Sequence, residues 1–241
     1  MGKLKLKSKH RLLCGDSIKH KDCDRLFDGD VAAMCFTDPP YNVAYNKQAD
    51  TGHSQQEITN DNMGSEEWLS FTQSIADTIK KYTDGCVYVF HAQGHDGRVM
   101  ACALDTTLHW SSSIVWVKHT MVFGRATYQR RCEMIWFGWR PDANKTFTSD
   151  RTLTDVWEFN KPSRSDMHPT MKPIELVAQA VSHASKKNQV VFDPFMGSGT
   201  TLIACEQLNR RCYGMEIDPL YCDVIVKRWE NLTGEKAVCN G

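Results

Sequence analysis

Apolar residues along the chain fall into two kinds of pattern, and the two kinds alternate. Short continuous apolar runs predict buried strands, and longer segments whose apolar residues recur every three or four positions predict amphipathic helices. The runs that predict strands span residues 10–16, 31–36, 85–91, 112–118, 134–137, 156–159, 189–193 and 211–218. Helices are predicted from Ser65, over residues 94–106, from Pro173, from about Thr200 and from about Pro219. Strands that alternate with helices predict an α/β fold with a doubly wound, mostly parallel sheet.

Two of the predicted helices have well-defined buried faces. Ser65 is a good N-cap candidate, and the two glutamates after it suit the positive end of the helix dipole. The apolar stripe of this helix consists of Trp68, Phe71, Ile75, Ile79 and Tyr82. The last helix has a similar stripe that consists of Tyr221, Ile225, Trp229 and Leu232. We expect both stripes to lie in the core.

The predicted strand over residues 31–36 leads into an acid, two prolines and an aromatic residue: Asp38, Pro39, Pro40 and Tyr41. Each proline fixes its φ angle and lacks an N–H donor, so the carbonyls of Asp38 and Pro39 are held with no local donor competing for them. Oxygen acceptors beside an aromatic face suit a planar group that carries an amino substituent, such as a nucleobase. A plain turn after a strand is the alternative, since Asp and Pro are common turn residues.

A second strand, which ends in Asp193, runs into a glycine turn. Gly197 and Gly199 allow positive φ angles and close approach of a ligand to the backbone, and the free N–H groups of the helix that starts near Thr200 would face that ligand. Glu216 ends the next strand, near the ~20-residue distance at which an acid grips the ribose hydroxyls in nucleotide-binding units. The glycine spacing departs from the dinucleotide fingerprint, so an adenosine-type cofactor without a pyrophosphate fits better than NAD.

Taken together, these motifs resemble those of the amino-group DNA methyltransferases that use S-adenosylmethionine (SAM). The tetrad at 38–41 precedes the glycine motif at 193–200, and this order is similar to that of the β class of the family, in which the two halves of the domain are permuted. His168-Pro169-Thr170-Met171-Lys172-Pro173 is a third match and Gly15-Asp16 is a weaker fourth. The matches run from about residue 11 to residue 232.

The resemblance implies a Rossmann-like class I SAM-methyltransferase fold, with a seven-stranded sheet in which one edge strand is reversed. It implies methyl transfer to the exocyclic N6 of an adenine flipped out of DNA, catalysed by the tetrad at 38–41. The Asp38 carboxylate and the Pro39 carbonyl would accept the amine hydrogens, and Tyr41 would replace the stacking that the flipped base loses. Because the sulfonium supplies the leaving group, no metal is expected. The residues placed at the cofactor are Asp16, Thr170, Lys172, Asp193, Pro194, Phe195, Gly197, Gly199, Thr200 and Glu216.

Arginines and aromatic residues interleave between Lys118 and Arg164, a composition that suits contacts with phosphates and DNA grooves. The residues favoured for DNA contact are Arg125, Tyr128, Arg130, Arg131 and Arg164. Trp136 and Trp157 lie in strand-like runs and are expected in the core. The resemblance makes residues 119–165 a short target-recognition insertion. It makes residues 42–63 a mobile loop that closes over the flipped base.

The resemblance leaves alternatives at the level of the target. In the family, Asp at the start of the tetrad goes mostly with adenine N6 and Ser with cytosine N4, so Asp38 favours adenine. Cytosine-N4 methylation stays open, as does a non-catalytic relative that binds DNA or SAM, although the intact tetrad and glycines argue against the latter. Enzymes that methylate a protein glutamine start the tetrad with Asn and place it after the cofactor motif, which disagrees with this chain.

Composition bears on the cellular setting more than on the chemistry. The 241 residues suit one large domain over residues 1–241, and the formal net charge of zero argues against a histone-like binder without excluding local DNA contacts. The ten cysteines include no Cys-x-x-Cys pair, which favours a reducing cytosol over a disulfide framework or a zinc site. No apolar stretch approaches ~18 residues and no signal peptide is evident, so we expect a cytoplasmic protein of a bacterial cell or of its phage. The expected partner is double-stranded DNA, and the resemblance allows a homodimer.

Overall fold

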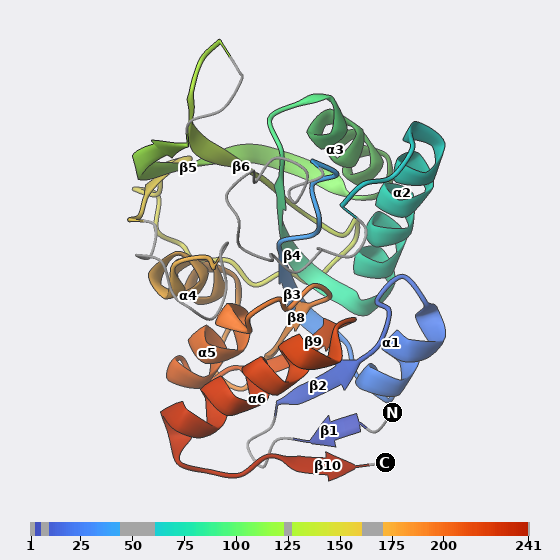
Figure 1. Ribbon diagram of the computed structural model, residues 1–241. Helices are drawn as coiled ribbons and strands as arrows, with labels where there is room; N and C mark the ends of the chain where they lie inside the picture. The colour runs from blue at the N-terminus through green and yellow to red at the C-terminus, as the bar shows by residue number, and fades with distance from the viewer. Residues whose placement is uncertain (1–2, 6–9, 44–60, 123–126, 161–170, 241) are drawn as a thin grey trace, which may run out of the picture.

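The computed structural model describes residues 3–5, 10–43, 61–122, 127–160 and 171–240 (Figure 1). Its described strands form one sheet with the order β10-β1-β2-β9-β8-β3-β4-β6-β5-β7. The strands are β1 (Lys3–Lys5), β2 (Arg11–Cys14), β3 (Ala32–Thr37), β4 (Thr83–His91), β5 (His109–Val122), β6 (Arg130–Trp139), β7 (Val156–Glu158), β8 (Val190–Asp193), β9 (Arg211–Glu216) and β10 (Val238–Asn240). The helices are α1 (His20–Phe27), α2 (Ser65–Tyr82), α3 (His95–Thr107), α4 (Ile174–Ala184), α5 (Thr200–Gln207) and α6 (Pro219–Thr233).

The predicted mostly parallel sheet is confirmed, with one correction to its order. Strands β2, β9, β8, β3 and β4 are parallel to one another in turn, and β6 is antiparallel to both of its neighbours, β4 and β5. The reversed strand is therefore second from the end of the seven central strands, not at the edge as expected. β6 is hydrogen-bonded along both of its edges, to β4 and to β5. The burial of three consecutive residues, Ile135, Trp136 and Phe137, fits such an interior strand.

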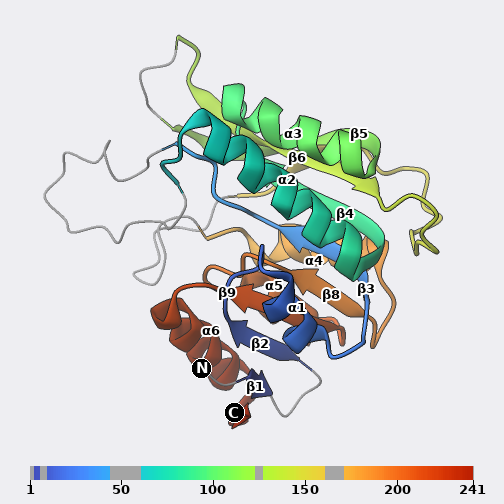
Figure 2. The ribbon, with the colours of Figure 1, turned by 90° about the vertical axis from the view of Figure 1, so that its right-hand side faces the viewer.

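Helices cover both faces of the sheet, as the doubly wound prediction requires. One layer holds α1, α2 and α3, and the other holds α4, α5 and α6 (Figure 2). Along β3, Met34 and Phe36 pack under the α4–α6 layer, whereas Cys35 between them packs under the α1–α3 layer. A strand covered on both faces has no polar side, which explains why the runs in the sequence are continuous and not alternating.

The predicted buried stripe is confirmed for α2 and is partly wrong for α6. All five stripe residues of α2 are buried, but Gly64 is the N-cap and Ser65 is the first helical residue. In α6 the buried face holds Cys222, Ile225 and Trp229. Tyr221 is therefore only half-buried, since the stripe is rotated by one residue. Leu232, in the last turn, is 45 % exposed. Trp136 and Trp157 are buried, as predicted.

Among the residues that the structure describes, none of the helices is long and apolar enough to cross a membrane. Most of the predicted mobile loop, residues 44–60, lies outside the described residues. Its described ends are tied together directly after the tetrad: the amide of Asn42 bonds with both the carbonyl and the N–H of Met63, and Asp61 accepts a hydrogen bond from the Val43 N–H.

Candidate active site

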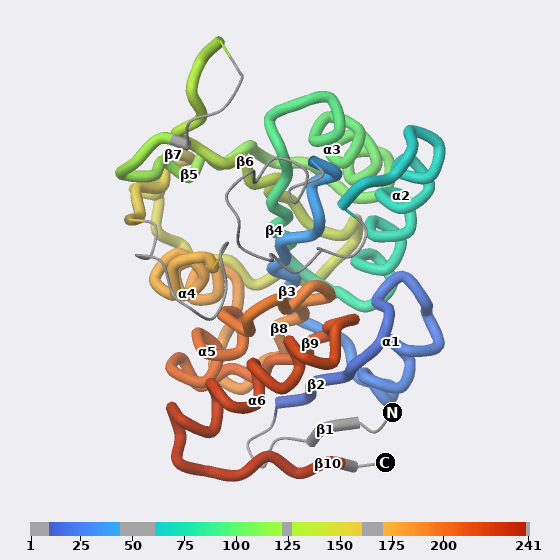
Figure 3. Tube along the Cα trace, in the orientation of Figure 1, coloured from blue at the N-terminus to red at the C-terminus, as the bar shows by residue number. Residues whose placement is uncertain are grey.

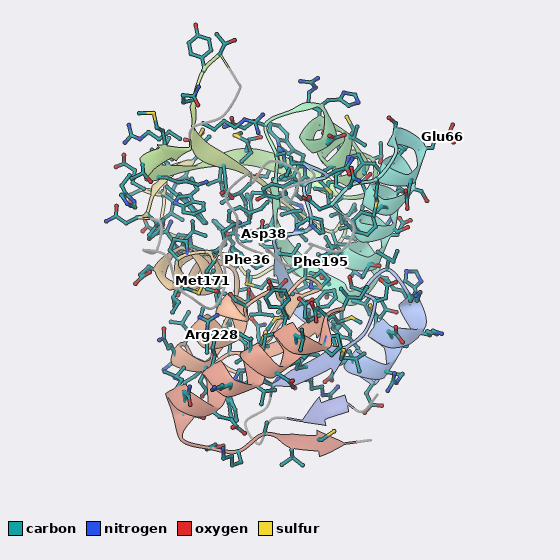
Figure 4. The ribbon with its side chains drawn as sticks, in the orientation of Figure 1. Phe36, Asp38, Glu66, Met171, Phe195 and Arg228 are labelled. Carbon is teal, nitrogen blue, oxygen red and sulfur yellow. The ribbon has the colours of Figure 1, made fainter. Side chains whose placement is uncertain are left out.

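The two motifs predicted to converge lie on neighbouring strands. β3 leads into the tetrad and β8 leads into the glycine turn, and the two strands pair in parallel at the centre of the sheet (Figure 3). At their carboxyl ends, the Thr37 hydroxyl donates a 3.0 Å hydrogen bond to the Asp193 carboxylate. Asp38 and Phe195, which follow these strand ends, lie near each other at the centre of the view in Figure 4. The predicted convergence of the two loops is therefore confirmed.

The backbone of the glycine turn has the predicted left-handed conformation. The φ angle is 50° at Gly197 and 85° at Gly199. A Cβ added to Gly199 would lie 3.0 Å from two side-chain carbons of Ile225. At this position glycine is therefore required by its φ angle and by the approach of α6.

Asp193 holds this turn together from the inside. Its buried carboxylate accepts hydrogen bonds from the Thr201 hydroxyl (2.6 Å), the Phe195 N–H (3.1 Å) and the Thr37 hydroxyl. Burial raises the pKa of Asp193 to about 7, although the three donors oppose the rise. The side chain thus links β3, β8 and α5, and its predicted contact with the cofactor stays a prediction.

Glu216, at the end of β9, lies against the glycine turn. Its carboxylate accepts hydrogen bonds from the Gly197 N–H (2.8 Å) and the Asp218 N–H (3.0 Å). Burial raises the pKa of Glu216, and the same N–H donors oppose that rise. The Gly15 N–H donates to the Glu216 carbonyl at 2.9 Å, which brings Asp16 to the same strand edge.

One buried polar group at the turn lacks a partner within the described part of the chain. The hydroxyl of Thr200, at the first residue of α5, has no hydrogen-bond partner among the described residues, and its side chain is buried. Buried polar groups are nearly always satisfied, so this hydroxyl is an observed position at which a ligand would complete the site. Thr200, Gly199 and Glu216 therefore fit a bound polar cofactor.

On the tetrad side of the site, five side chains form what we call the charged cluster: Asp38, Tyr41, Lys118, Glu133 and Lys172. The Lys172 ammonium lies 2.5 Å from one Asp38 oxygen and 3.2 Å from Glu133. The Tyr41 hydroxyl donates to the other Asp38 oxygen at 2.7 Å and to Glu133 at 3.1 Å. Lys118 pairs with the second Glu133 oxygen at 2.5 Å. The cluster thus alternates two cations with two anions.

Burial and pairing act against each other on the charges of this cluster. Burial raises the pKa of Asp38, and the Lys172 ammonium beside it opposes the rise. Burial would also raise the pKa of Glu133, but Lys172 and Lys118 outweigh it and hold that pKa at about 2. Burial would lower the pKa of Lys172, but the carboxylates of Asp38 and Glu133 raise it above its ordinary value. Lys172 therefore contacts the catalytic candidate Asp38, and its predicted contact with the cofactor stays a prediction.

Sequence reasoning missed Glu133 and Lys118, which belong to no motif. The sequence did hold a signal for them, in the alternation of inward-facing and outward-facing residues along each strand. Lys118 follows Ile114 and Trp116 at a spacing of two, and Glu133 precedes Ile135 at the same spacing. Ile114, Trp116 and Ile135 all lie in one core cluster. Charged residues at inward-facing strand positions are rare unless they are paired. This rarity is the signal by which Lys118 and Glu133 could have been identified as candidates.

The predicted DNA contacts divide into described and undescribed residues. Tyr128 is 88 % exposed, and Arg130 and Arg131 are exposed at the start of β6. They lie at the end of the β5–β6 hairpin, which projects from the layered body (Figure 1). Arg125, Arg164 and the cofactor candidate Thr170 lie outside the described residues.

No group of three or more His, Cys, Asp or Glu side chains in the described ranges is arranged to hold a metal ion. Pro194, which follows Asp193 at the start of the glycine turn, is buried. Phe195 is half-buried against Phe71 of α2, with ring centroids 6.2 Å apart. The candidate site therefore offers carboxylates, lysines, backbone N–H groups and aromatic rings.

Comparisons with known proteins identify the family of the chain. The N6/N4 methyltransferase family model, described as DNA methylase, matches residues 32–227. The type II methyltransferase M.HpaI of Haemophilus parainfluenzae is 25 % identical over 248 positions, covering 92 % of this chain and 74 % of the relative. The structure of a putative DNA modification methylase of Thermus thermophilus, complexed with S-adenosyl-L-methionine, is similar in fold with a TM-score of 0.64 and 20 % identity, covering 92 % of this chain and 93 % of that one.

A second solved structure extends the likeness to an enzyme with a defined target. The PvuII DNA methyltransferase, which is cytosine-N4-specific, has a TM-score of 0.66 and 15 % identity, covering 93 % of this chain and 90 % of that one. At this identity the likeness concerns the fold alone. The family match spans the tetrad, the glycine turn and Glu216. The chain therefore belongs to the N6/N4 family of DNA methylases.

Proposed function

We propose that this protein transfers a methyl group from SAM to the exocyclic N6 of an adenine flipped out of double-stranded DNA. The observation that carries the proposal is the meeting of the tetrad and the glycine turn at one sheet edge, joined by the bond between Thr37 and Asp193. In open α/β sheets, ligands bind in the crevice at the carboxyl ends of the strands. An acceptor for an amine and a cradle for a cofactor would thus lie at the same edge of the sheet.

The glycine turn is the proposed cofactor cradle. The unpartnered Thr200 hydroxyl and the positive φ of Gly199 offer a ligand a donor and a close backbone approach. The Glu216 carboxylate keeps lone pairs free after it accepts two N–H bonds, and these suit ribose hydroxyls. SAM, when bound, supplies a methyl group activated by the adjacent sulfonium. Asp193 shapes this cradle, and Phe195 would pack along it.

Asp38 is the proposed acceptor for the amine. The lone pair of an exocyclic amine is delocalised into the base, so the nitrogen is a poor nucleophile until its hydrogens are held out of the ring plane. The Asp38 side chain is 29 % exposed, more than Lys118, Glu133 or Lys172. Each of its oxygens accepts one hydrogen bond from the chain and retains a lone pair. Asp38 and the Pro39 carbonyl could therefore each accept one amine hydrogen.

The rise in the pKa of Asp38 suits the end of the reaction as well. Burial raises the pKa of Asp38, so its carboxylate takes up the proton that a newly methylated amine releases more readily than an exposed carboxylate would. Lys172, within 2.5 Å, keeps the carboxylate ionised beforehand. The chain thus provides an acceptor for the hydrogens before transfer and for a proton after it.

Tyr41 and the β5–β6 hairpin are the proposed contacts with DNA. The Tyr41 hydroxyl is fixed by Asp38 and Glu133, which holds its ring beside the acceptor, where it would stack on the flipped base. Flipping costs a few kcal/mol, and such stacking offsets part of that cost. Arg130 and Arg131, exposed on the hairpin, would neutralise phosphates.

The test is transfer of labelled methyl groups from SAM to unmethylated duplex DNA, compared between the wild-type chain and Asp38→Ala. The proposal predicts label in DNA with the wild type and none with the variant, while calorimetry shows SAM binding in both. A non-catalytic DNA-binding or SAM-binding protein would transfer no label. Equal loss of transfer and SAM binding in the variant would make Asp38 a structural residue.

A further inference from the structure

Glu133 contacts both of the groups that contact Asp38. One of its oxygens lies 3.2 Å from the Lys172 ammonium and 3.1 Å from the Tyr41 hydroxyl. Those two groups in turn hold the two separate oxygens of the Asp38 carboxylate. The position of the carboxylate therefore depends on Glu133 through two independent routes, although Glu133 does not touch it.

Glu133 is itself fixed from the far side by Lys118. The Lys118 ammonium pairs with the other Glu133 oxygen, and the side chains of both residues are largely buried, 9 % and 19 % exposed. Taking paired charges out of water is costly, and an apolar pair of similar volume is often as stable or more stable. Lys118, Glu133 and Lys172, three largely buried charges beside the more exposed Asp38 carboxylate, are thus poorly explained by stability alone.

We propose that Glu133 and Lys118 are positioning residues for methyl transfer, which orient Lys172 and Tyr41 so that the Asp38 carboxylate stays available to the amine. The inference rests on the proposed catalytic role of Asp38. Glu133 shares the Lys172 ammonium with Asp38. Without Glu133, that ammonium would be held by Asp38 alone, and the oxygen needed by the base would be occupied more tightly.

Lys118 connects this arrangement to the projecting hairpin. Its backbone carbonyl accepts a 2.9 Å hydrogen bond from the Arg131 guanidinium, and Arg131 is exposed. Lys118 lies on β5 and Glu133 on β6, the two strands of the hairpin. The positioning residues therefore belong to the segment that would contact DNA, and they reach the tetrad from there.

The charges around Asp38 predict that its pKa shifts in opposite directions in two variants. Glu133 repels a negative charge on Asp38 and competes for Lys172, so Glu133→Gln lowers the pKa of Asp38. The acidic limb of the pH profile of single-turnover transfer therefore moves to lower pH. Lys172→Met removes the cation that favours the Asp38 carboxylate and moves that limb to higher pH. Asp193 also faces Asp38, from β8. Asp193 titrates in the wild type and in both variants, so its titration does not account for a difference between them.

The experiment measures single-turnover methyl transfer to unmethylated genomic duplex DNA, because product release often limits kcat. We expect Glu133→Gln to slow transfer by about 10- to 100-fold, the size of effect that a misplacement near 1 Å produces, with an unchanged SAM affinity. Glu133→Asp, which keeps the charge, should restore the wild-type pH profile although transfer stays slow. Glu66→Gln is the control, since Glu66 is exposed on α2 and far from Asp38 (Figure 4).

If Glu133→Gln fails to fold, the double variant Lys118→Met/Glu133→Gln removes one charge of each sign and should show the same shift to lower pH. A wild-type rate and pH profile in either Gln variant would overturn the inference. Shifts in the same direction for Glu133→Gln and Lys172→Met would overturn it too. Failure of the proposed function is distinguishable, because the wild-type chain would then transfer no label to DNA, or Asp38→Ala would transfer as well as the wild type.

Discussion

Replacing Gly199 by alanine tests whether the glycine turn is a cradle that α6 holds in place. The φ angle of 85° is left-handed, which costs an L-residue about 1–2 kcal/mol. The new methyl carbon would also lie 3.0 Å from two carbons of Ile225, so the neighbour must shift by a few tenths of an ångström. Overpacking of this kind costs at least about 1 kcal/mol. The expected loss is about 2–3 kcal/mol, or about 4–12 °C in Tm for a chain of this size.

Gly234→Ala is the matched control, because Gly234 has a φ of 73° but nothing within 4 Å of the added carbon. It carries the backbone strain without the contact, and it lies at the end of α6, away from the turn. Thermal melts and calorimetric SAM titrations of both variants separate the effects. Only Gly199→Ala should raise the SAM Kd. The expected rise is about tenfold for each 1.4 kcal/mol of binding free energy that is lost because the turn has moved. Equal losses of Tm in the two variants, or an unchanged SAM Kd in Gly199→Ala, would refute the reasoning.

Three further predictions concern other parts of the site. Asp38→Ala should abolish methyl transfer while SAM affinity by calorimetry changes little, and retained transfer would remove Asp38 from the chemistry. Arg130→Ala should weaken DNA binding and reduce its log–log salt slope by about one at constant SAM affinity, and an unchanged slope would remove Arg130 from the interface. The raised pKa of Asp193, about 7 against 3.8 unfolded, means its carboxyl favours folding at low pH, and that contribution is lost as pH rises through about 7. On the order of 3 kcal/mol of the free energy of unfolding is lost between about pH 5 and about pH 8. The Tm advantage of wild type over Asp193→Asn should therefore shrink across that range. A constant difference in Tm would contradict the raised pKa of Asp193.

The convergence of the two loops could be predicted from the sequence because it follows from a rule of topology. Asp38 and Asp193 each end an apolar run, and parallel strands bring their carboxyl ends to one edge of a sheet. Gly199 could be predicted for a similar reason, since a positive φ is a local backbone property. These features depend on neighbours in sequence or on a general rule of strand order.

The charged cluster could not be predicted, because it depends on strand pairing. Glu133 lies on β6, which pairs with both β4 and β5, whereas the resemblance implies that the reversed strand is at the edge. The resemblance places Lys172 at the cofactor and does not reveal that its ammonium pairs with Asp38. Helical spacing predicts that Leu232 lies in the core. The spacing does not reveal at which turn of α6 the packing against the rest of the protein ends.

The most direct test of the central claim is mass spectrometry of nucleosides from unmethylated duplex DNA incubated with the protein and SAM that carries a deuterated methyl group. The account predicts N6-methyl-2′-deoxyadenosine with a deuterated methyl group, absent from the same reaction with Asp38→Ala. Label on cytosine N4 would contradict the preference for adenine while keeping the amine chemistry. Label on a ring carbon, or no label in DNA at all, would contradict an amine acceptor at Asp38.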